Sequence, residues 1–142
     1  MSDAPNDPDV TARLLRTRLA AGALDLPVAG SSMRGVIDSG STVEVHAGSA
    51  PRVGEIWAFT ADDGTIVVHR VRRVSADTIV CRGTGNRFDD EPVGHQRLVG
   101  TVISVSNPAG TRRFGRGDRI RAAAEFRVRA TLRRLRRTLS GR

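Results

Sequence analysis

The middle of the chain alternates apolar and polar residues in short runs, a pattern typical of β-strands with one buried face. From Leu26 onward, valine-rich runs are separated by glycine, aspartate and proline. The sequences ADDG (61–64) and SAD (75–77) lie between such runs, and Asp-Gly pairs favour tight hairpin turns. The pattern therefore predicts a system of antiparallel strands, carried by STVEVHAG, VGEIWAFTADDGTIVVHRVRRVSADTIVCRGTG and RLVGTVISV.

The two flanks of this region have the spacing of helices. Near the start, DVTARLLRTRLAAG predicts a short helix with Asp9 as its N-cap and Gly22 as its stop. The sequence NPAG (107–110) predicts the end of the β region. After it, DRIRAAAEFRVRATLRRLRRTLS predicts a second helix. We therefore expect a mainly β fold with a short N-terminal helix and a basic C-terminal helix.

The length of 142 residues has room for one domain of ordinary size. We expect an N-terminal segment with a short helix at 1–26, a β domain at 27–106, and a linker with an arginine-rich helix at 107–142. No run approaches the ~18 apolar residues of a membrane-spanning helix. The opening residues, which include Asp3 and Asp7, lack the apolar core of a secretory signal peptide. These features predict a cytoplasmic location.

Charge is distributed unevenly along the chain. Through Gly110 there are 11 arginines against 13 acidic residues, whereas from Thr111 onward there are 12 arginines against two acidic residues. All 23 basic residues are arginine, so the chain contains no lysine. The single cysteine, Cys81, excludes an internal disulfide framework and a multi-cysteine metal site. We expect no metal and no cofactor.

The segment VAGSSMRGVIDSGSTVEV (28–45) contains two adjacent serines. A serine hydroxyl is a weak nucleophile until a base takes its proton, and an isolated Gly-Ser-Ser is more often a turn. Lysine is absent, and arginine cannot act as the base because its pKa stays above about 12. Histidine is the remaining base for neutral pH, and the chain has three: His46, His69 and His95.

His69 lies in a valine-rich run. Strand alternation places its side chain on one face with Val67 and Val71, and Arg70 and Arg72 on the other. Burial beside valines disfavours the charged imidazolium and keeps the ring available as a proton acceptor. A core histidine bonded to a backbone carbonyl would show the same pattern. The run by itself leaves both alternatives open.

Five segments resemble, in their order and spacing, the successive boxes of signal peptidase I-like serine peptidases. They cover about residues 27–105 and read GSSMRGVIDSGSTVEV, VGEIWAF, GTIVVHRV, RGTGNRFDDEPV and RLVGTVISV. The histidine of HRV resembles the endoplasmic-reticulum-type form, which uses a Ser-His pair, and the chain resembles short anchorless bacterial members. The resemblance implies an antiparallel β peptidase fold like that of signal peptidases and SOS-repressor peptidases.

The resemblance also implies roles at matching positions. The serine directly before the methionine, Ser32, corresponds to the nucleophile, and His69 to the base. The final Asp of the family's acidic box falls on Asp90, which would orient the imidazole. The backbone N–H of Ser32 is the expected oxyanion donor. Nearby support is expected from Ser31, Met33 and Asp89, and the sequence leaves open whether Asp89 or Asp90 faces the imidazole.

The chain departs from the family pattern at Gly35 in place of a proline, at Ser41 and Glu55 in place of aspartates, and at Thr84 in place of the first Asp of the acidic box. If that Asp orients the histidine, Thr84 would reduce or alter activity. We expect a serine endopeptidase that cleaves a peptide or leader-type precursor. The alternative is a catalytically inactive peptidase-fold domain that binds a peptide or partner protein.

The tail at 118–139 is predicted to be a basic amphipathic helix. Such a helix can lie on an anionic membrane surface at the inner face of the membrane, or pack its apolar stripe on the sheet. No nucleic-acid-binding motif is present, so no specific nucleic-acid partner is expected. The stripe consists of Ile120, Ala124, Val128, Leu132, Leu135 and Leu139.

Overall fold

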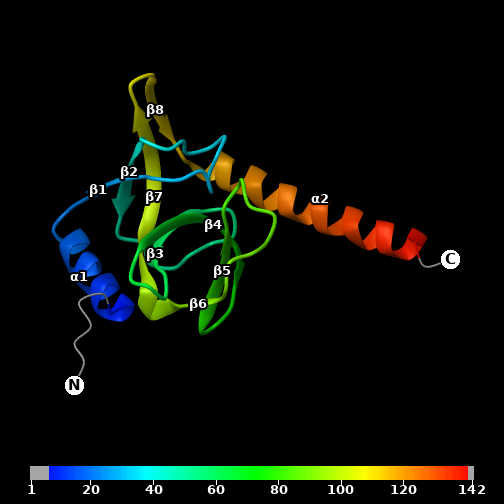
Figure 1. Ribbon diagram of the computed structural model, residues 1–142, viewed down its shortest axis with the longest axis horizontal. Helices are drawn as coiled ribbons and strands as arrows, with labels where there is room; N and C mark the ends of the chain where they lie inside the picture. Colours follow the sequence, from blue (N-terminus) through cyan, green and yellow to red (C-terminus); the bar gives the residue numbers. More distant parts are fainter. Residues whose placement is uncertain (1–6, 141–142) are drawn as a thin grey trace.

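A computed structural model describes residues 7–140 of the chain (Figure 1). Strands form the middle, and a helix flanks them at each end. The first part of the predicted N-terminal segment, residues 1–6, lies outside the described residues. In chain order the elements are α1 (Pro8–Ala20), β1 (Leu24–Pro27), β2 (Thr42–His46), β3 (Ile56–Thr60), β4 (Ile66–Val74), β5 (Thr78–Arg82), β6 (Val93–Gly94), the short 3-10 helix η1 (His95–Arg97), β7 (Leu98–Asn107), β8 (Gly110–Arg113) and α2 (Arg116–Ser140).

The strands form one sheet in the order β1-β2-β7-β3-β4-β5-β6, with β8 paired to β7. Every pairing is antiparallel. The hairpin turns at 61–64 and 75–77 lie where the sequence predicts them, joining β3 to β4 and β4 to β5. The expected mainly β, antiparallel fold with a short N-terminal helix and a C-terminal helix is confirmed.

The cap of α1 differs from the prediction. The Asp7 carboxylate accepts hydrogen bonds from the backbone N–H groups of Asp9 (2.9 Å) and Val10 (3.2 Å), so the prediction of Asp9 as the cap is wrong. Pro8 occupies the first helical position, where its fixed φ suits a helix start and its missing N–H costs nothing. The predicted stop is confirmed, because Gly22 follows the helix end with a φ of +147°.

The turn at 107–110 reverses the chain instead of ending the β region. β8 follows it directly and pairs with β7 from Asn107↔Gly110 to Ser104↔Arg113. The Ala109 N–H donates to the Asn107 side-chain oxygen (2.8 Å), which closes the turn. The prediction was wrong because asparagine and glycine favour a tight reversal that lets a strand continue the sheet. The division at residue 107 stays a prediction, and β8 lies beyond it.

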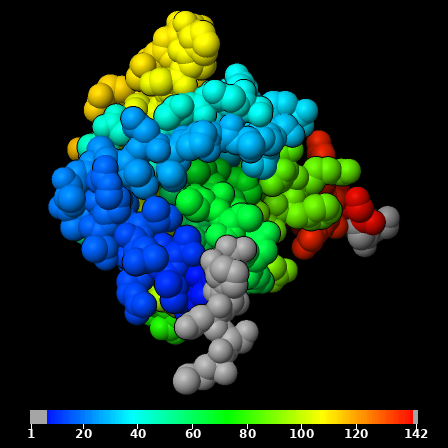
Figure 2. Space-filling model, turned by 60° about the vertical axis from the view of Figure 1, so that its left-hand side comes forward, coloured from blue at the N-terminus to red at the C-terminus, as the bar shows by residue number. Residues whose placement is uncertain are grey.

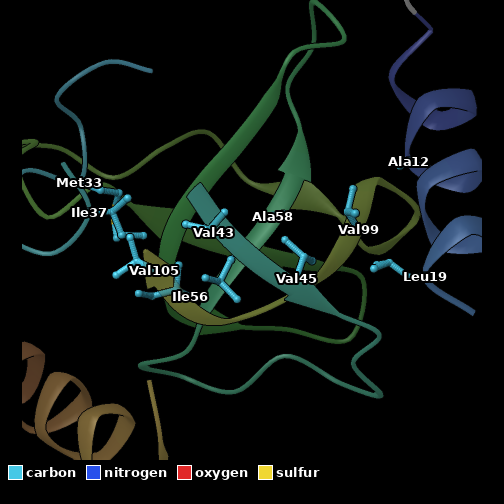
Figure 3. Close-up of a cluster of buried hydrophobic side chains, with 11 residues drawn as sticks. Ala12, Leu19, Met33, Ile37, Val43, Val45, Ile56, Ala58, Val99 and Val105 are labelled. Atoms are coloured by element: carbon cyan, nitrogen blue, oxygen red, sulfur yellow. The ribbon is translucent and has the colours of Figure 1, made fainter. Parts of the chain in front are cut away.

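Buried side chains form two clusters separated by the sheet, and β3 contributes to both because all five of its residues are buried. Ile56 and Ala58 belong to the larger cluster, whereas Trp57 and Phe59 belong to the smaller one. The larger cluster joins the loop after β1 to the sheet and to α1 (Figure 3). Its members are Ala12, Leu19, Met33, Ile37, Val43, Val45, Ile56, Ala58, Val99, Val102 and Val105.

Contacts in the first half of α2 attach the helix to the sheet. Arg70 donates to Asp118 (3.0 Å), and the Arg72 guanidinium lies over the Phe126 ring at 4.9 Å from its centre. Every residue from 127 to 140 is exposed, and the helix extends away from the strands (Figure 1). Within residues 7–140, no helix is long and apolar enough to cross a membrane.

Candidate active site

Ser32 lies in the turn that follows β1. Gly30 and Gly35 flank this turn with φ values of +87° and +85°, which glycine adopts without strain. The N–H of Ile37 donates to the carbonyl of Met33 (2.8 Å), giving the turn a helical backbone bond. The Met33 side chain is 2% exposed and packs in the larger cluster. The hydroxyl of Ser32 is therefore presented from a turn that the core holds in place.

A glycine-containing loop after β5 supports the same turn from the other side. The N–H of Gly85 donates to the Ser32 carbonyl (2.9 Å). A Cβ atom at Gly83 would lie 2.3 Å from that carbonyl oxygen, so a larger residue there would displace one of the two segments. The Thr84 hydroxyl donates to the carbonyl of Arg34 (3.2 Å). Thr84 thus contacts the serine turn, and the acid that contacts the imidazole comes from elsewhere.

His69 connects the serine to an acid. Its Nε2 lies 2.9 Å from the Ser32 Oγ, and its Nδ1 lies 2.5 Å from Oδ2 of Asp90. Both distances are those of hydrogen bonds. The side chain is 9% exposed, and its ring meets the edge of Phe59 at a centroid distance of 6.2 Å. The imidazole therefore bonds to a serine and a carboxylate, and not to a backbone carbonyl.

The two neighbouring acids face different partners. Asp90 is held by its backbone N–H, which donates to the Cys81 carbonyl (2.8 Å), and its carboxylate contacts the imidazole. Asp89 accepts a hydrogen bond from Arg72 (2.8 Å). The structure thus brings Asp90 to the imidazole and directs Asp89 toward arginines. This is the choice that the sequence left open.

A family model for Peptidase S24-like domains matches residues 9–103, which is more than half of the chain. The chain belongs to the Peptidase S24-like family. A search of curated proteins finds no match. Membership supports a serine peptidase-type function in general terms and agrees with the antiparallel sheet described above.

The departures from the signal peptidase-like pattern lie in turns of this S24-like domain. Gly35 has a φ of +85°, which a proline cannot adopt, so the backbone here differs from one that carries proline. Ser41 is buried, at 2% exposure. The Glu55 carboxylate accepts from the Arg52 N–H (2.6 Å), which closes the turn before β3.

The other two histidines of the S24-like domain are engaged elsewhere. His46 contacts the carboxylate of Glu44 (2.8 Å), and this hydrogen bond lowers the pKa of Glu44. His95 contacts the Ser75 carbonyl (3.1 Å). Ser31 is exposed, and its carbonyl accepts a backbone hydrogen bond within the serine turn. In the described part of the chain, no three His, Cys, Asp or Glu side chains are grouped so that they could hold a metal ion.

The thiol of Cys81 lies close to the catalytic candidates of the S24-like domain but is inert at neutral pH. Its side chain is fully buried, and burial raises the pKa of the thiol to about 12, with the negative charge of Asp90 adding to the effect. The thiolate is the reactive form of cysteine. Cys81 is therefore a packing residue, and Ser32 is the nucleophile candidate.

Two pockets meet at His69 in the S24-like domain. One of about 460 Å³ lies between the segment that leads to Ser32 and strand β4. In Figure 2 the surface of the first segment is the blue-to-cyan band, and green surface lies below it. The lining of this pocket is mainly apolar: Leu26, Pro27, Val28, Ala29, Met33, Ile66, Val67 and Val68. The second, of about 470 Å³, lies on the Asp90 side and includes Phe59, Glu91 and Pro92.

Proposed function

We propose that this protein is a serine endopeptidase of the signal peptidase I-like, Ser-His type, with Ser32 as its nucleophile. The observation that carries the proposal is the 2.9 Å distance between His69 Nε2 and Ser32 Oγ. This distance is within the range over which a general base takes a proton. Membership of the Peptidase S24-like family supports a serine peptidase-type function independently of this distance.

The reaction follows from the positions of the three groups. Ser32 Oγ attacks the carbonyl carbon of a peptide bond while His69 Nε2 takes its proton, giving a tetrahedral intermediate. His69 then returns the proton to the amine nitrogen, the C–N bond breaks, and an ester to Ser32 remains. Water attacks that ester, giving its proton to His69, and the released Ser32 oxygen takes the proton back.

Asp90 orients the base in this mechanism. By accepting the hydrogen bond of His69 Nδ1–H, it keeps Nε2 free to receive the serine proton and stabilises the imidazolium that forms. The oxyanion is proposed to bind the backbone N–H of Ser32, which the turn holds in a defined direction. The hydroxyl of Ser31 is the candidate for a second donor.

The substrate is proposed to be a peptide or a leader-type precursor. The family resemblance implies a small residue on the acyl side of the cleaved bond, and the mainly apolar lining of the pocket beside Ser32 supports an apolar one. β1 ends the strand order of the sheet and leads directly into the serine turn. An extended peptide can add to such an edge through backbone hydrogen bonds.

Covalent labelling with a fluorophosphonate probe tests the proposal. A serine that a neighbouring base activates attacks the phosphorus of the probe and becomes labelled. Wild-type protein and Ser31→Ala are expected to be labelled, and Ser32→Ala is not. Absence of labelling in folded wild-type protein would favour the alternative, a catalytically inactive domain that binds a peptide or partner protein.

We also propose that α2 contacts an anionic membrane surface, which would make the protein peripheral at the inner face of the membrane. The helix carries nine arginines against two acidic residues. Its apolar stripe is exposed, with Leu132 at 52%, Leu135 at 55% and Leu139 at 79%. Charge complementarity to anionic lipids and shallow insertion of the leucines support this contact.

A further inference from the structure

A narrow pocket between α2 and the strands β4 and β5 is lined almost entirely by arginines. It has a volume of about 210 Å³, and Phe126 and Ala130 are its only uncharged lining residues. The remaining lining residues are Arg72, Arg82, Arg129, Arg133, Arg134 and Arg137, which together we call the arginine groove.

The arginine groove concentrates positive charge with little compensation. Among residues 7–140, Asp89 is the carboxylate within ion-pair distance of it, at 2.8 Å from Arg72 and 3.9 Å from Arg82. Arg82 is 11% exposed, and its Nε is the buried side-chain nitrogen that lacks a hydrogen-bond partner in this part of the chain. Burial first, and then repulsion from Arg72, Arg133 and Arg129, lower the pKa of Arg82. Such a cluster would be relieved by an anion.

The fold positions both walls of the groove. The register of β4 against β5 shifts between Val71 and Arg73, so Arg72 sits in an irregularity of the strand. Its guanidinium lies over the ring of Phe126, which ties the strand to α2. The Arg82 side chain on β5 donates to the carbonyl of Arg87. The two strand arginines of the groove, Arg72 and Arg82, are therefore held in place by contacts with the rest of the protein.

We propose that the arginine groove binds an acidic stretch of the substrate polypeptide outside the cleavage site. This inference rests on the proposed peptidase function. Arg72 follows His69 by three residues on β4, which is about 10 Å along a strand. Asp89 directly precedes Asp90 in the loop between β5 and β6, so this loop also joins the groove to the site. From Phe126 to Arg137 the helix rises about 17 Å, enough for about five extended residues.

The structure favours a polypeptide carboxylate over lipid or nucleic acid. A carboxylate of the protein itself, that of Asp89, accepts a hydrogen bond from Arg72 and lies within ion-pair distance of Arg82, so a carboxylate is a group that these arginines can receive. At about 100° per residue, Arg133 and Arg137 lie on the side of α2 opposite Leu132 and Leu135. A bilayer held by the leucines would therefore leave the groove free. An acidic side chain of such a peptide can enter the pocket of about 210 Å³ between helix and strands, and the rest of the peptide would lie along the exposed arginines of α2.

The test measures binding of fluorescein-labelled hexaglutamate by anisotropy. The proteins are the full chain, its Ser32→Ala variant, and two double variants with equal charge change. Arg129→Gln with Arg133→Gln removes two groove arginines, whereas Arg127→Gln with Arg136→Gln removes two exposed arginines that do not line it. Unlabelled hexaglutamate, a single-stranded oligonucleotide and anionic vesicles serve as competitors, and uncharged hexaglutamine is the negative control. Circular dichroism confirms that each variant is folded.

We expect the groove variant to bind hexaglutamate about tenfold more weakly or worse, because it loses charge-assisted hydrogen bonds. The control double variant should stay within about threefold of wild type, since exposed charges are screened by salt. Equal weakening in both double variants, no hexaglutamate binding, or competition by the oligonucleotide or vesicles but not by unlabelled hexaglutamate would overturn the proposal. Binding by Ser32→Ala is independent of catalysis, so a protein that binds hexaglutamate but resists acylation overturns the peptidase function alone.

Discussion

Asp89 and Asp90 are adjacent in the chain, yet one carboxylate binds an arginine and the other binds the histidine of the proposed catalytic site. Asp90 lies 2.5 Å from the imidazole of His69, and Asp89 lies 2.8 Å from the guanidinium of Arg72. In an extended segment, successive side chains point to opposite sides. The pair therefore joins the proposed catalytic site to the arginine groove through a single peptide unit.

Replacing Asp90 by asparagine is expected to slow acylation of Ser32 by about a thousandfold to ten-thousandfold, since the histidine would lose its orientation and the stabilisation of its charged form. Asp89→Asn should slow acylation far less, because it removes a contact with Arg72 and leaves the imidazole bonded to Asp90. Rates of fluorophosphonate labelling measure both effects. Equal rates for the two variants would contradict the assignment of Asp90.

Gly83→Ala is expected to distort the serine turn. The new Cβ would lie 2.3 Å from the Ser32 carbonyl oxygen, so the two loops must separate, at a cost of about 1–3 kcal/mol in the free energy of unfolding. Gly117→Ala is the matched control, since it has open space and lies in α2. Urea unfolding and labelling rates should show loss of stability and of acylation for Gly83→Ala alone. Wild-type labelling by Gly83→Ala would disprove the tight approach.

The thiol of Cys81 should dominate the pH dependence of stability in alkaline solution. The chain contains no tyrosine and no lysine, so Cys81 is the side chain that titrates between the ranges of histidine and arginine. Its pKa rises from the ordinary 9.0 to about 12 in the folded protein. Between these two pKa values the thiol ionises in the unfolded state but stays protonated in the folded state, and ionisation stabilises the unfolded state alone. The free energy of unfolding should therefore fall by about 1.4 kcal/mol per pH unit above the ordinary value.

Denaturant unfolding at several pH values between the two pKa values measures how the free energy of unfolding changes with pH. In Cys81→Ala this pH dependence should be much weaker. Iodoacetamide should also modify the native thiol far more slowly than the unfolded one, because thiolate and access are both lacking. Rapid alkylation of the native protein would contradict the burial of this residue.

Leu135→Gln is expected to weaken binding to anionic vesicles by about tenfold or more, since burying a leucine contributes about 1.5–3 kcal/mol. Leu14→Gln on α1 is the control, because Leu14 is an exposed leucine (63%) outside the stripe. Co-sedimentation with anionic and with neutral vesicles measures the effect. Truncation after Phe126 removes Val128, Leu132, Leu135 and Leu139 of the stripe together, and it keeps β8 and the attached part of α2. Unchanged sedimentation of the truncated chain would remove the membrane contact.

Much of the fold could be predicted from short stretches of sequence. Alternating valines and the turns at 61–64 and 75–77 predicted the hairpins, and helical spacing predicted both helices, because these features depend on neighbours within a few residues. The prediction failed at Asp9 and at the turn 107–110. At the first, Asp7 and Asp9 can both cap a helix, and Pro8 at the first helical position goes with Asp7 as the cap. At the second, a turn signal marks a reversal of the chain but does not tell whether another strand follows it.

The candidate site shows the same division. Composition alone excluded a lysine base. The resemblance to signal peptidase I-like serine peptidases pointed to Ser32, His69 and Asp90, whose catalytic roles stay a proposal. Which of two adjacent acids meets the imidazole depended on the path of the loop after β5. That Thr84 supports the serine turn, and that arginines from β4, β5 and α2 line one groove, had no signal in the sequence. These contacts join residues far apart in the chain, and their geometry is set by strand register and loop closure, which only the folded structure determines.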